Sequence, residues 1–278
     1  MDNNGMHFGF TREEMLVFMI TLKDLEMKEP MNVNIGGEKK QISKYGNHIL
    51  FYDAGMPWRQ CVSLVFKHIT YLFRMEIQIL YCHNPAAMKF IRRRQSTPLW
   101  MTYAGDWGSS MYWTIENYEA DKCIRTKGLC FRGWIPEDYD FSLKRDYEYV
   151  QAKRWNCREL EDVLKIVRRS KEVVLDESRL VSKNVNDLFN HWLENRIDGL
   201  KFLSIKMAYL SYTEALVFRG IEHRITDTTE EVNYKSFTGE LYQLSPGKCL
   251  RRDDGVIASF SYDPNTWILN FGVVDDVN

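Results

Sequence analysis

The sequence predicts an α/β fold for this chain of 278 residues. Between residues 57 and 207, segments with a helical apolar stripe alternate with short apolar segments, which is typical of helix-then-strand units. After Met207 short strand-like segments are separated by turn residues, which predicts antiparallel strands. The composition, 45% hydrophobic with 14% aromatic residues, supplies the apolar surface that a well-buried core needs.

The first fifty residues predict one helix followed by strands. Residues 11–27 read as an amphipathic helix, because Thr11 precedes Glu14 by three positions as in a capping box. Residues 32–55 read as two strands joined by a turn at Gly36 and Gly37.

Three later segments predict a helix followed by a strand. Pro57 opens a helix over residues 57–73, and a strand follows in residues 74–82. Asn156 and Asn184 are the expected N-caps of the next two helices. Their strands are expected at Glu172–Leu175 and Leu200–Ile205. The apolar stripes of these last two helices are formed by Leu160, Val163, Leu164, Val167, Leu188, Phe189, Trp192 and Leu193.

Strand spacing predicts irregular leucine-rich-repeat-like α/β units. The spacing of about 20 to 30 residues lies in the range of such repeats, although no strict Leu-x-x-Leu-x-Leu recurs. An ordinary α/β layer fold without repeat ancestry is the alternative. The expected strand centres are Ile79, Met101, Gly128, Tyr147, Val174 and Leu203.

The C-terminal part predicts an antiparallel β-meander. Asp254-Gly255 between apolar segments indicates a two-residue type I′ turn. The charged stretch Leu250–Gly255 therefore reads as a solvated turn and not as a catalytic pair of carboxylates. Trp267, Leu269, Phe271 and Val273 are expected on one face of the last strand.

Charge and cysteine usage argue against several functions. The formal net charge of −1 gives no general basic field, which argues against nucleic acid despite the basic run Arg92–Arg94. The six cysteines contain no C-x-x-C pair, so we expect buried thiols and no metal. The apolar run Met15–Leu22 is too short to cross a bilayer. We expect an intracellular protein, cytoplasmic or nuclear, with no membrane partner.

No catalytic motif is visible. The chain has no G-x-S-x-G, no phosphate-binding glycine loop and no H-E-x-x-H. We therefore expect no enzyme activity, no catalytic residue and no cofactor. A small hydrolase and an RNA-binding protein are the weaker alternatives.

Four blocks in the second half resemble the nematode F-box associated domain of the second type. They are "AKRWNCRELEDVLKI", "KNVNDLFNHWLENRIDGLKFLSIKM", "LVFRGIEHR" and "CLRRDDGVIASFSY", in the family's order. The resemblance is specific over residues 151–273 and looser over residues 48–150. The matched residues are Trp155, Asn186, Leu188, Phe189, Trp192, Leu203, Gly220, Arg252, Asp254, Gly255 and Ala258.

The resemblance implies a protein-interaction module. Similar proteins carry an F-box that docks on the Skp adaptor of a cullin-based ubiquitin ligase, and the associated domain recognises the protein substrate. Residues 1–47 lack the expected F-box entry, so we interpret them as a degenerate or missing F-box region before an associated domain over residues 48–278. A stand-alone binding protein with no ubiquitin role is the alternative.

Partner contacts are expected from two aromatic, loop-like segments, residues 100–112 and 134–139. Trp and Tyr are enriched in binding hot spots. The candidate residues are Trp100, Trp107, Tyr112 and Trp134. The matched residues Phe189 and Trp192 are expected in the core, and Gly220 and Gly255 are expected to serve backbone geometry.

Overall fold

A computed structural model divides the chain into two compact units, residues 1–99 with 123–125 and residues 100–122 with 126–278. Each unit is described by itself. The residues that the structure describes are 5–9, 15–20, 31–35, 37–45, 48–52, 64, 67–68, 71, 78–82, 95–104, 125–135, 143–155, 157, 159–194, 196–209, 211–228, 232–244 and 247–274.

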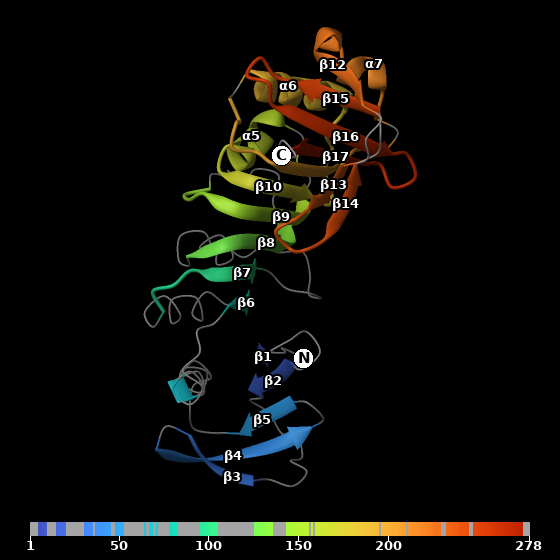
Figure 1. The fold of residues 1–278 in the computed structure, drawn as a ribbon. Helices are drawn as coiled ribbons and strands as arrows, with labels where there is room; N and C mark the ends of the chain where they lie inside the picture. Colours follow the sequence, from blue (N-terminus) through green and yellow to red (C-terminus); the bar gives the residue numbers. More distant parts are fainter. Residues whose placement is uncertain are drawn as a thin grey trace. The chain divides into compact units, whose positions relative to one another are not determined.

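The first unit contains a five-stranded sheet of order β1-β2-β5-β4-β3 (Figure 1). Strands β2 and β5 are parallel, and the other neighbours are antiparallel. Gly37, at φ +90°, lies in the predicted turn between β3 and β4. The predicted boundary at residue 47 falls between β4 and β5. The strands are β1 (Gly5–Gly9), β2 (Met15–Ile20), β3 (Met31–Ile35), β4 (Glu38–Tyr45) and β5 (His48–Tyr52).

The helix predicted over residues 11–27 is wrong at its centre, residues 15–20, and the rest of it lies outside the described residues. Its apolar centre, Met15–Ile20, is strand β2, which pairs with β1 on one side and with β5 on the other. A short continuous apolar run fits a buried strand as well as a helix, and periodicity alone does not separate the two. The segment forms a strand because it pairs with β1 and β5, and this pairing cannot be read from the period of the sequence.

The predicted helix-then-strand unit over residues 57–82 agrees with the part that the structure describes. Residues 64, 67, 68 and 71 are helical, and the rest of residues 57–73 lie outside the described residues. Strand β6 (Ile79–Cys82) follows, as expected.

The second unit is built on a large mixed sheet that runs in the order β12-β15-β16-β17-β11-β10-β9-β8-β7 (Figure 1). Strands β8 to β11 are mutually parallel, and β11, β17, β16, β15 and β12 pair antiparallel in that order. All six predicted strand centres fall in strands. The elements are β7 (Leu99–Ala104), β8 (Thr126–Ile135), β9 (Tyr147–Trp155), α5 (Leu160–Val167), β10 (Ser170–Leu175), α6 (Ser182–Leu193), β11 (Phe202–Lys206), α7 (Glu214–Val217), η1 (Glu222–Arg224), β12 (Ile225–Thr228), β13 (Val232–Lys235), β14 (Leu241–Leu244), β15 (Gly247–Arg251), β16 (Ile257–Asp263) and β17 (Ile268–Val274).

Helix α6 packs its predicted apolar stripe onto the sheet. Phe189 and Trp192 are buried, and their rings lie 5.4 and 5.2 Å from that of Phe271 on β17. Such aromatic pairs stabilise a core beyond the burial of their area. No helix of the described residues is both long and apolar enough to cross a bilayer.

Both predicted N-caps are wrong. Helix α5 has Glu159 at its N-cap, because strand β9 runs on to Trp155. Asn156 lies outside the described residues. Helix α6 has Val181 at its N-cap, and Asn184 is its third residue. Asn184 still stabilises the helix end, because its Oδ1 accepts the backbone N–H of Val181 at 3.0 Å.

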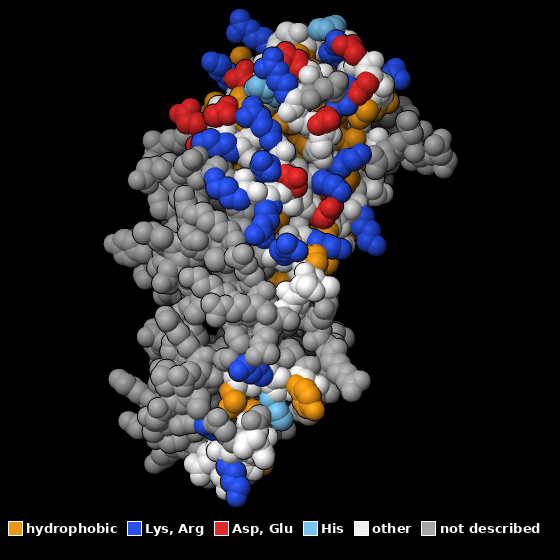
Figure 2. All heavy atoms as spheres, turned by 90° about the vertical axis from the view of Figure 1, so that its left-hand side faces the viewer, with side chains coloured by type: hydrophobic (Ala, Val, Ile, Leu, Met, Phe, Trp, Pro, Cys, Tyr) orange, Lys and Arg blue, Asp and Glu red, His pale blue; other side chains and the backbone are white. Residues whose placement is uncertain are grey.

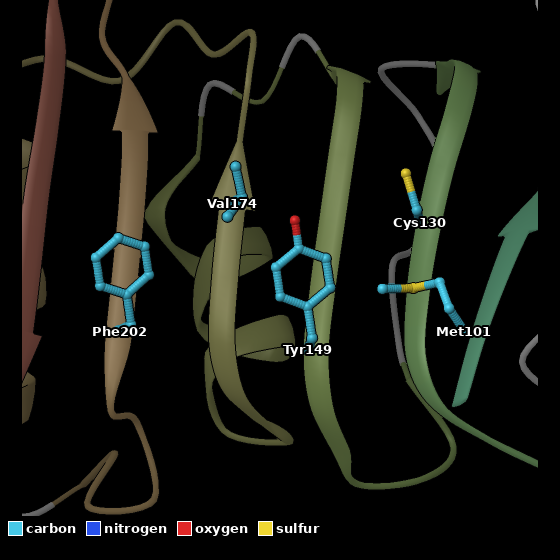
Figure 3. Close-up of a cluster of buried hydrophobic side chains, with 5 residues drawn as sticks. All are labelled: Met101, Cys130, Tyr149, Val174 and Phe202. Carbon is cyan, nitrogen blue, oxygen red and sulfur yellow. The ribbon is translucent and has the colours of Figure 1, made fainter. Parts of the chain in front are cut away.

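The opposite face of the sheet is covered by the β13–β14 hairpin. Figure 3 shows five buried side chains pointing to this face from neighbouring strands. Tyr234, Phe237 and Tyr242 of the hairpin pack against them. The sheet is thus covered on both faces, which parallel strands require. The five side chains are Met101, Cys130, Tyr149, Val174 and Phe202.

The type I′ turn predicted at Asp254-Gly255 is also wrong. Asp254 has no positive φ, and Gly255 at φ +90° is the left-handed residue of this loop. The N–H of Gly255 donates to the carbonyl of Arg252, and the N–H of Arg252 donates to the carbonyl of Val256. The loop therefore has three residues and closes as a turn followed by a glycine bulge. Gly220, at φ +81°, likewise serves the backbone, as expected.

Candidate functional site: an aromatic end of the sheet

Four aromatic side chains gather where β11 and the β16–β17 hairpin end. We call them the aromatic end: Tyr209, Tyr212, Tyr262 and Trp267. The first two follow β11, and the other two flank the turn between β16 and β17. The two segments are joined because the N–H of Met207 donates to the carbonyl of Trp267 at 2.8 Å.

The turn folds around the side chain of Asp263. Its carboxylate accepts the backbone N–H of Asn265 at 2.9 Å and the hydroxyl of Thr266 at 2.7 Å. These hydrogen bonds, that from Thr266 foremost, hold the pKa of Asp263 below its ordinary value. Asx turns of this kind are a local way to reverse the chain. The N–H of Trp267 closes the turn on the carbonyl of Asp263 at 2.8 Å.

Trp267 occupies the left-handed region of backbone space, with φ at +59°. It is the only residue other than glycine with positive φ among those that the structure describes. Glycine or asparagine usually takes such a position, because a bulky L-residue there is strained by about 1–2 kcal/mol. The prediction that Trp267 lies on the face of the last strand is therefore wrong, whereas Leu269, Phe271 and Val273 are buried as expected.

The four rings form two pairs. Tyr209 meets Trp267 edge-on, with 4.6 Å between ring centroids, and Tyr212 stacks on Tyr262 at 3.8 Å. Tyr209 remains 67% exposed. Burial raises the pKa of Tyr212 to about 12, so its phenol stays neutral at physiological pH. The aromatic end thus offers uncharged, rigid aromatic surface with polar tips, a composition typical of protein-binding hot spots.

Of the four predicted site residues, the structure describes the side chain of Trp100 alone. Trp100 lies in strand β7 and not in a loop, and its ring stacks on that of Phe237 at 4.9 Å. Trp134 lies in strand β8, and its side chain is outside the described residues. Trp107 and Tyr112 also lie outside them. Trp100 is partly buried as part of the hairpin-side packing, which leaves it little surface for a partner.

The charged loop 252–254 divides into a buried cation and two exposed carboxylates. Asp253 pairs with Arg224 and Asp254 pairs with Arg252. Each ion pair holds the pKa of its carboxyl below the ordinary value, which is the opposite of what a general acid requires. The two aspartates are solvated as predicted. Arg252, however, is buried, and its guanidinium lies 5.2 Å from the ring centre of Trp192.

Three cysteines, Cys130, Cys157 and Cys249, are buried thiols, as expected. Burial raises the pKa of Cys130 to about 11 and that of Cys157 to about 12, and it also raises the pKa of Cys249. A nucleophilic cysteine needs a lowered pKa. Cys130 donates instead to Gln151, whose amide donates to Asp176 at 2.8 Å. Within the described ranges no group of three or more His, Cys, Asp or Glu is arranged to hold a metal ion.

No protein-family model matches the chain, and no match was found among curated proteins or among solved structures.

Proposed function

We propose that this chain is a protein-interaction module and that the aromatic end is its binding surface. The observation that carries the proposal is Trp267, held at positive φ with its ring against the exposed ring of Tyr209. Backbone strain of this kind is concentrated at functional sites in proteins. Neither ring of this pair is deeply buried, since Trp267 is partly exposed and Tyr209 is largely exposed.

The family resemblance supports a protein as the partner. It implies a role like that of the substrate-recognition part of a Skp–cullin–F-box ubiquitin ligase, inside the cell, with a protein substrate. The leucine-rich-repeat-like interpretation belongs to the same proposal, because helix-then-strand units recur up to β11. Raised cysteine pKa values and lowered aspartate pKa values at the candidate positions support a role without catalysis.

A stand-alone binding module is the second form of this proposal. An F-box is helical, whereas the described parts of residues 1–47 form strands β1 to β4. This difference favours a binding protein that does not dock on the Skp adaptor. A ligase subunit would be recovered together with the Skp adaptor and the cullin, whereas a stand-alone binding module would be recovered without them.

Affinity purification of the tagged full chain from its own cells tests both points. We expect partner proteins to be recovered with the wild type and with Leu241→Ala. The same partners should be lost with Tyr209→Ala and with Trp267→Ala. Leu241 is a matched control, because it is another strongly exposed apolar residue, at 71%. Partners that are kept by all four proteins would contradict the aromatic end as the binding surface. Blotting for the Skp adaptor decides between the two forms.

A further inference from the structure

At the aromatic end, the rings of Tyr209 and Trp267 meet in a corner. Their planes are nearly perpendicular, at 76°, with 4.6 Å between the ring centroids. Two aromatic faces therefore stand at almost a right angle to each other. Tyr209 is largely exposed and Trp267 is partly exposed, so a ligand can reach the corner from solvent.

Two backbone hydrogen bonds hold this corner in place. The N–H of Trp267 donates to the carbonyl of Asp263, and the carbonyl of Trp267 accepts the N–H of Met207, both at 2.8 Å. The first closes the turn that carries Trp267, and the second ties this turn to the segment that leads to Tyr209. A site whose side chains are positioned before the ligand arrives loses less entropy on binding.

The faces of aromatic rings attract cations, because the face carries partial negative charge. The protein itself contains such a contact, since the guanidinium of Arg252 lies 5.2 Å from the ring centre of Trp192. Among the residues that the structure describes, no cation lies over the ring of Tyr209 or of Trp267. The corner is therefore open to a cation from another molecule.

The charged groups that act on the neighbouring pair of rings are carboxylates. Burial raises the pKa of Tyr262, and the carboxylate of Asp263 raises it further. Burial also raises the pKa of Tyr212, and the carboxylate of Glu214 adds to this effect. Negative charge next to the rings favours a cationic ligand and disfavours nucleic acid, because it repels phosphate.

The carboxylate of Asp263 keeps its charge for a partner. It accepts hydrogen bonds from neutral donors, the hydroxyl of Thr266 and the N–H of Asn265, and these bonds hold its pKa below the ordinary value. Glu214, in contrast, already pairs with Lys248. Over the face that Figure 2 shows, Lys and Arg side chains likewise lie beside Asp and Glu side chains. Asp263 is thus the carboxylate at the aromatic end that is left to attract a cation.

We propose that the corner between Tyr209 and Trp267 binds a weakly hydrated cationic side chain of the partner protein, an arginine or a methylated lysine. This role rests on the proposed function, since it names the group that the aromatic end recognises. A guanidinium or a methylated ammonium contacts ring faces readily, whereas the ammonium of an unmodified lysine is strongly hydrated. Asp263, in the same turn as Trp267, supplies the complementary charge.

NMR of the full chain with isotope-labelled tryptophan tests the proposal. The indole N–H signal of Trp267 is identified as the one that disappears in Trp267→Phe. Choline and methylguanidinium represent the two cationic side chains. Their neutral analogues are methylurea and the alcohol in which carbon replaces the choline nitrogen. We expect the cations to shift the signal saturably and to bind about tenfold more tightly than their neutral analogues, and the tighter cation identifies the side chain.

Two variants separate the ring from the charge. Tyr209→Leu keeps an apolar side chain without a ring face, and Asp263→Asn keeps an oxygen that accepts hydrogen bonds but carries no charge. We expect each variant to lose about threefold or more in affinity for the cations, and less than about twofold for the neutral analogues. Asp146→Asn is the control for charge and should bind as the wild type does. Asp146 is 84% exposed and precedes β9, whereas Tyr209 follows β11, which runs parallel to β9 through β10.

Three results would overturn the proposal. These are no shift with either cation, equal affinities for the cations and their neutral analogues, or an equal loss in Asp146→Asn and Asp263→Asn. The titration needs no partner protein, so it is independent of the purification experiment. Partners that are lost with Trp267→Ala, together with a failed titration, would overturn this role and leave the proposed function standing. Partners that are kept with Trp267→Ala would contradict the proposed function itself.

Discussion

Glu172 on β10 accepts the backbone N–H of Phe237 with both carboxylate oxygens, at 2.8 and 3.0 Å. The hydroxyl of Tyr234 donates to the same carboxylate at 2.9 Å. This single buried side chain therefore fastens the β13–β14 hairpin to the face of the sheet shown in Figure 3. Removing it takes away the acceptor of two partly buried donors, and the loss of such a hydrogen bond to a charged group costs about 1–3 kcal/mol. We expect Glu172→Ala to lower the free energy of unfolding accordingly, measured by urea denaturation.

The same carboxyl predicts a pH dependence of stability. Burial, the largest effect, raises the pKa of Glu172 above its ordinary 4.5, so the folded chain binds a proton that the unfolded chain releases. This contribution to stability is present below pH 4.5 and is lost as the pH rises through the raised folded pKa. We expect the free energy of unfolding of the wild type to fall in this window relative to that of Glu172→Gln. A constant difference between the two proteins across the window would contradict the linkage.

Strain at Trp267 can be separated from the contacts of its ring. Trp267→Ala removes the ring and keeps a side chain at φ +59°, whereas Trp267→Gly removes both the ring and the strain. We expect the glycine variant to be more stable than the alanine variant by about 1 kcal/mol, because glycine adopts positive φ freely. Urea denaturation of the two variants measures the difference, and equal stabilities would show that the turn is unstrained.

Gly128 on β8 is predicted to tolerate no side chain. A Cβ there would lie 2.8 Å from the sulfur of Met101 and 2.9 Å from the ring of Phe237. Overpacking of this kind typically costs about 1–3 kcal/mol, so we expect Gly128→Ala to lower the thermal midpoint. Gly199→Ala is the control, because its Cβ would meet nothing within 4 Å and its φ is not positive. An equally large loss in the control would contradict the packing argument.

Burial should protect two thiols from alkylation. The pKa of Cys130 is raised to about 11 and that of Cys157 to about 12, so little thiolate exists at pH 8, and the thiolate is the reactive form. We expect iodoacetamide at pH 8 to label both residues in urea and neither in the folded chain. Peptide mass spectrometry reads the labelling at each position. Rapid labelling of either residue in the folded chain would contradict the environment described for it.

The sequence predicts well those features that depend on local periodicity. The stripe of α6 and the strand centres followed from spacing alone, because a 3.6-residue or two-residue period reports one buried face. The helix over residues 11–27 failed because Met15–Ile20 is too short a run for its period to be read. Its strand partners lie elsewhere in the chain, and β5 begins only at His48.

The candidate site was harder to predict because it depends on turns and on distant contacts. The sequence predicts Trp267 on the face of the last strand that Leu269 and Phe271 share, but the turn after Asp263 extends through Trp267 and ends the alternation. Nothing near Arg252 in the sequence indicates burial, since its aromatic neighbour, Trp192, lies sixty positions earlier. The Asp-Pro-Asn sequence followed closely by a tryptophan was the one available signal for the aromatic end.

The attachment of the hairpin by Glu172 has a consequence for synthesis on the ribosome. Strands β8 to β11 are complete once Lys206 has been made, but the hairpin that covers their aromatic and apolar face ends only at Leu244. Until then Met101, Tyr149 and Phe202 lack their cover, and exposed apolar surface on a nascent sheet favours aggregation. This interval is set by the order of the elements along the chain, and we expect the nascent protein to be most prone to aggregation during it.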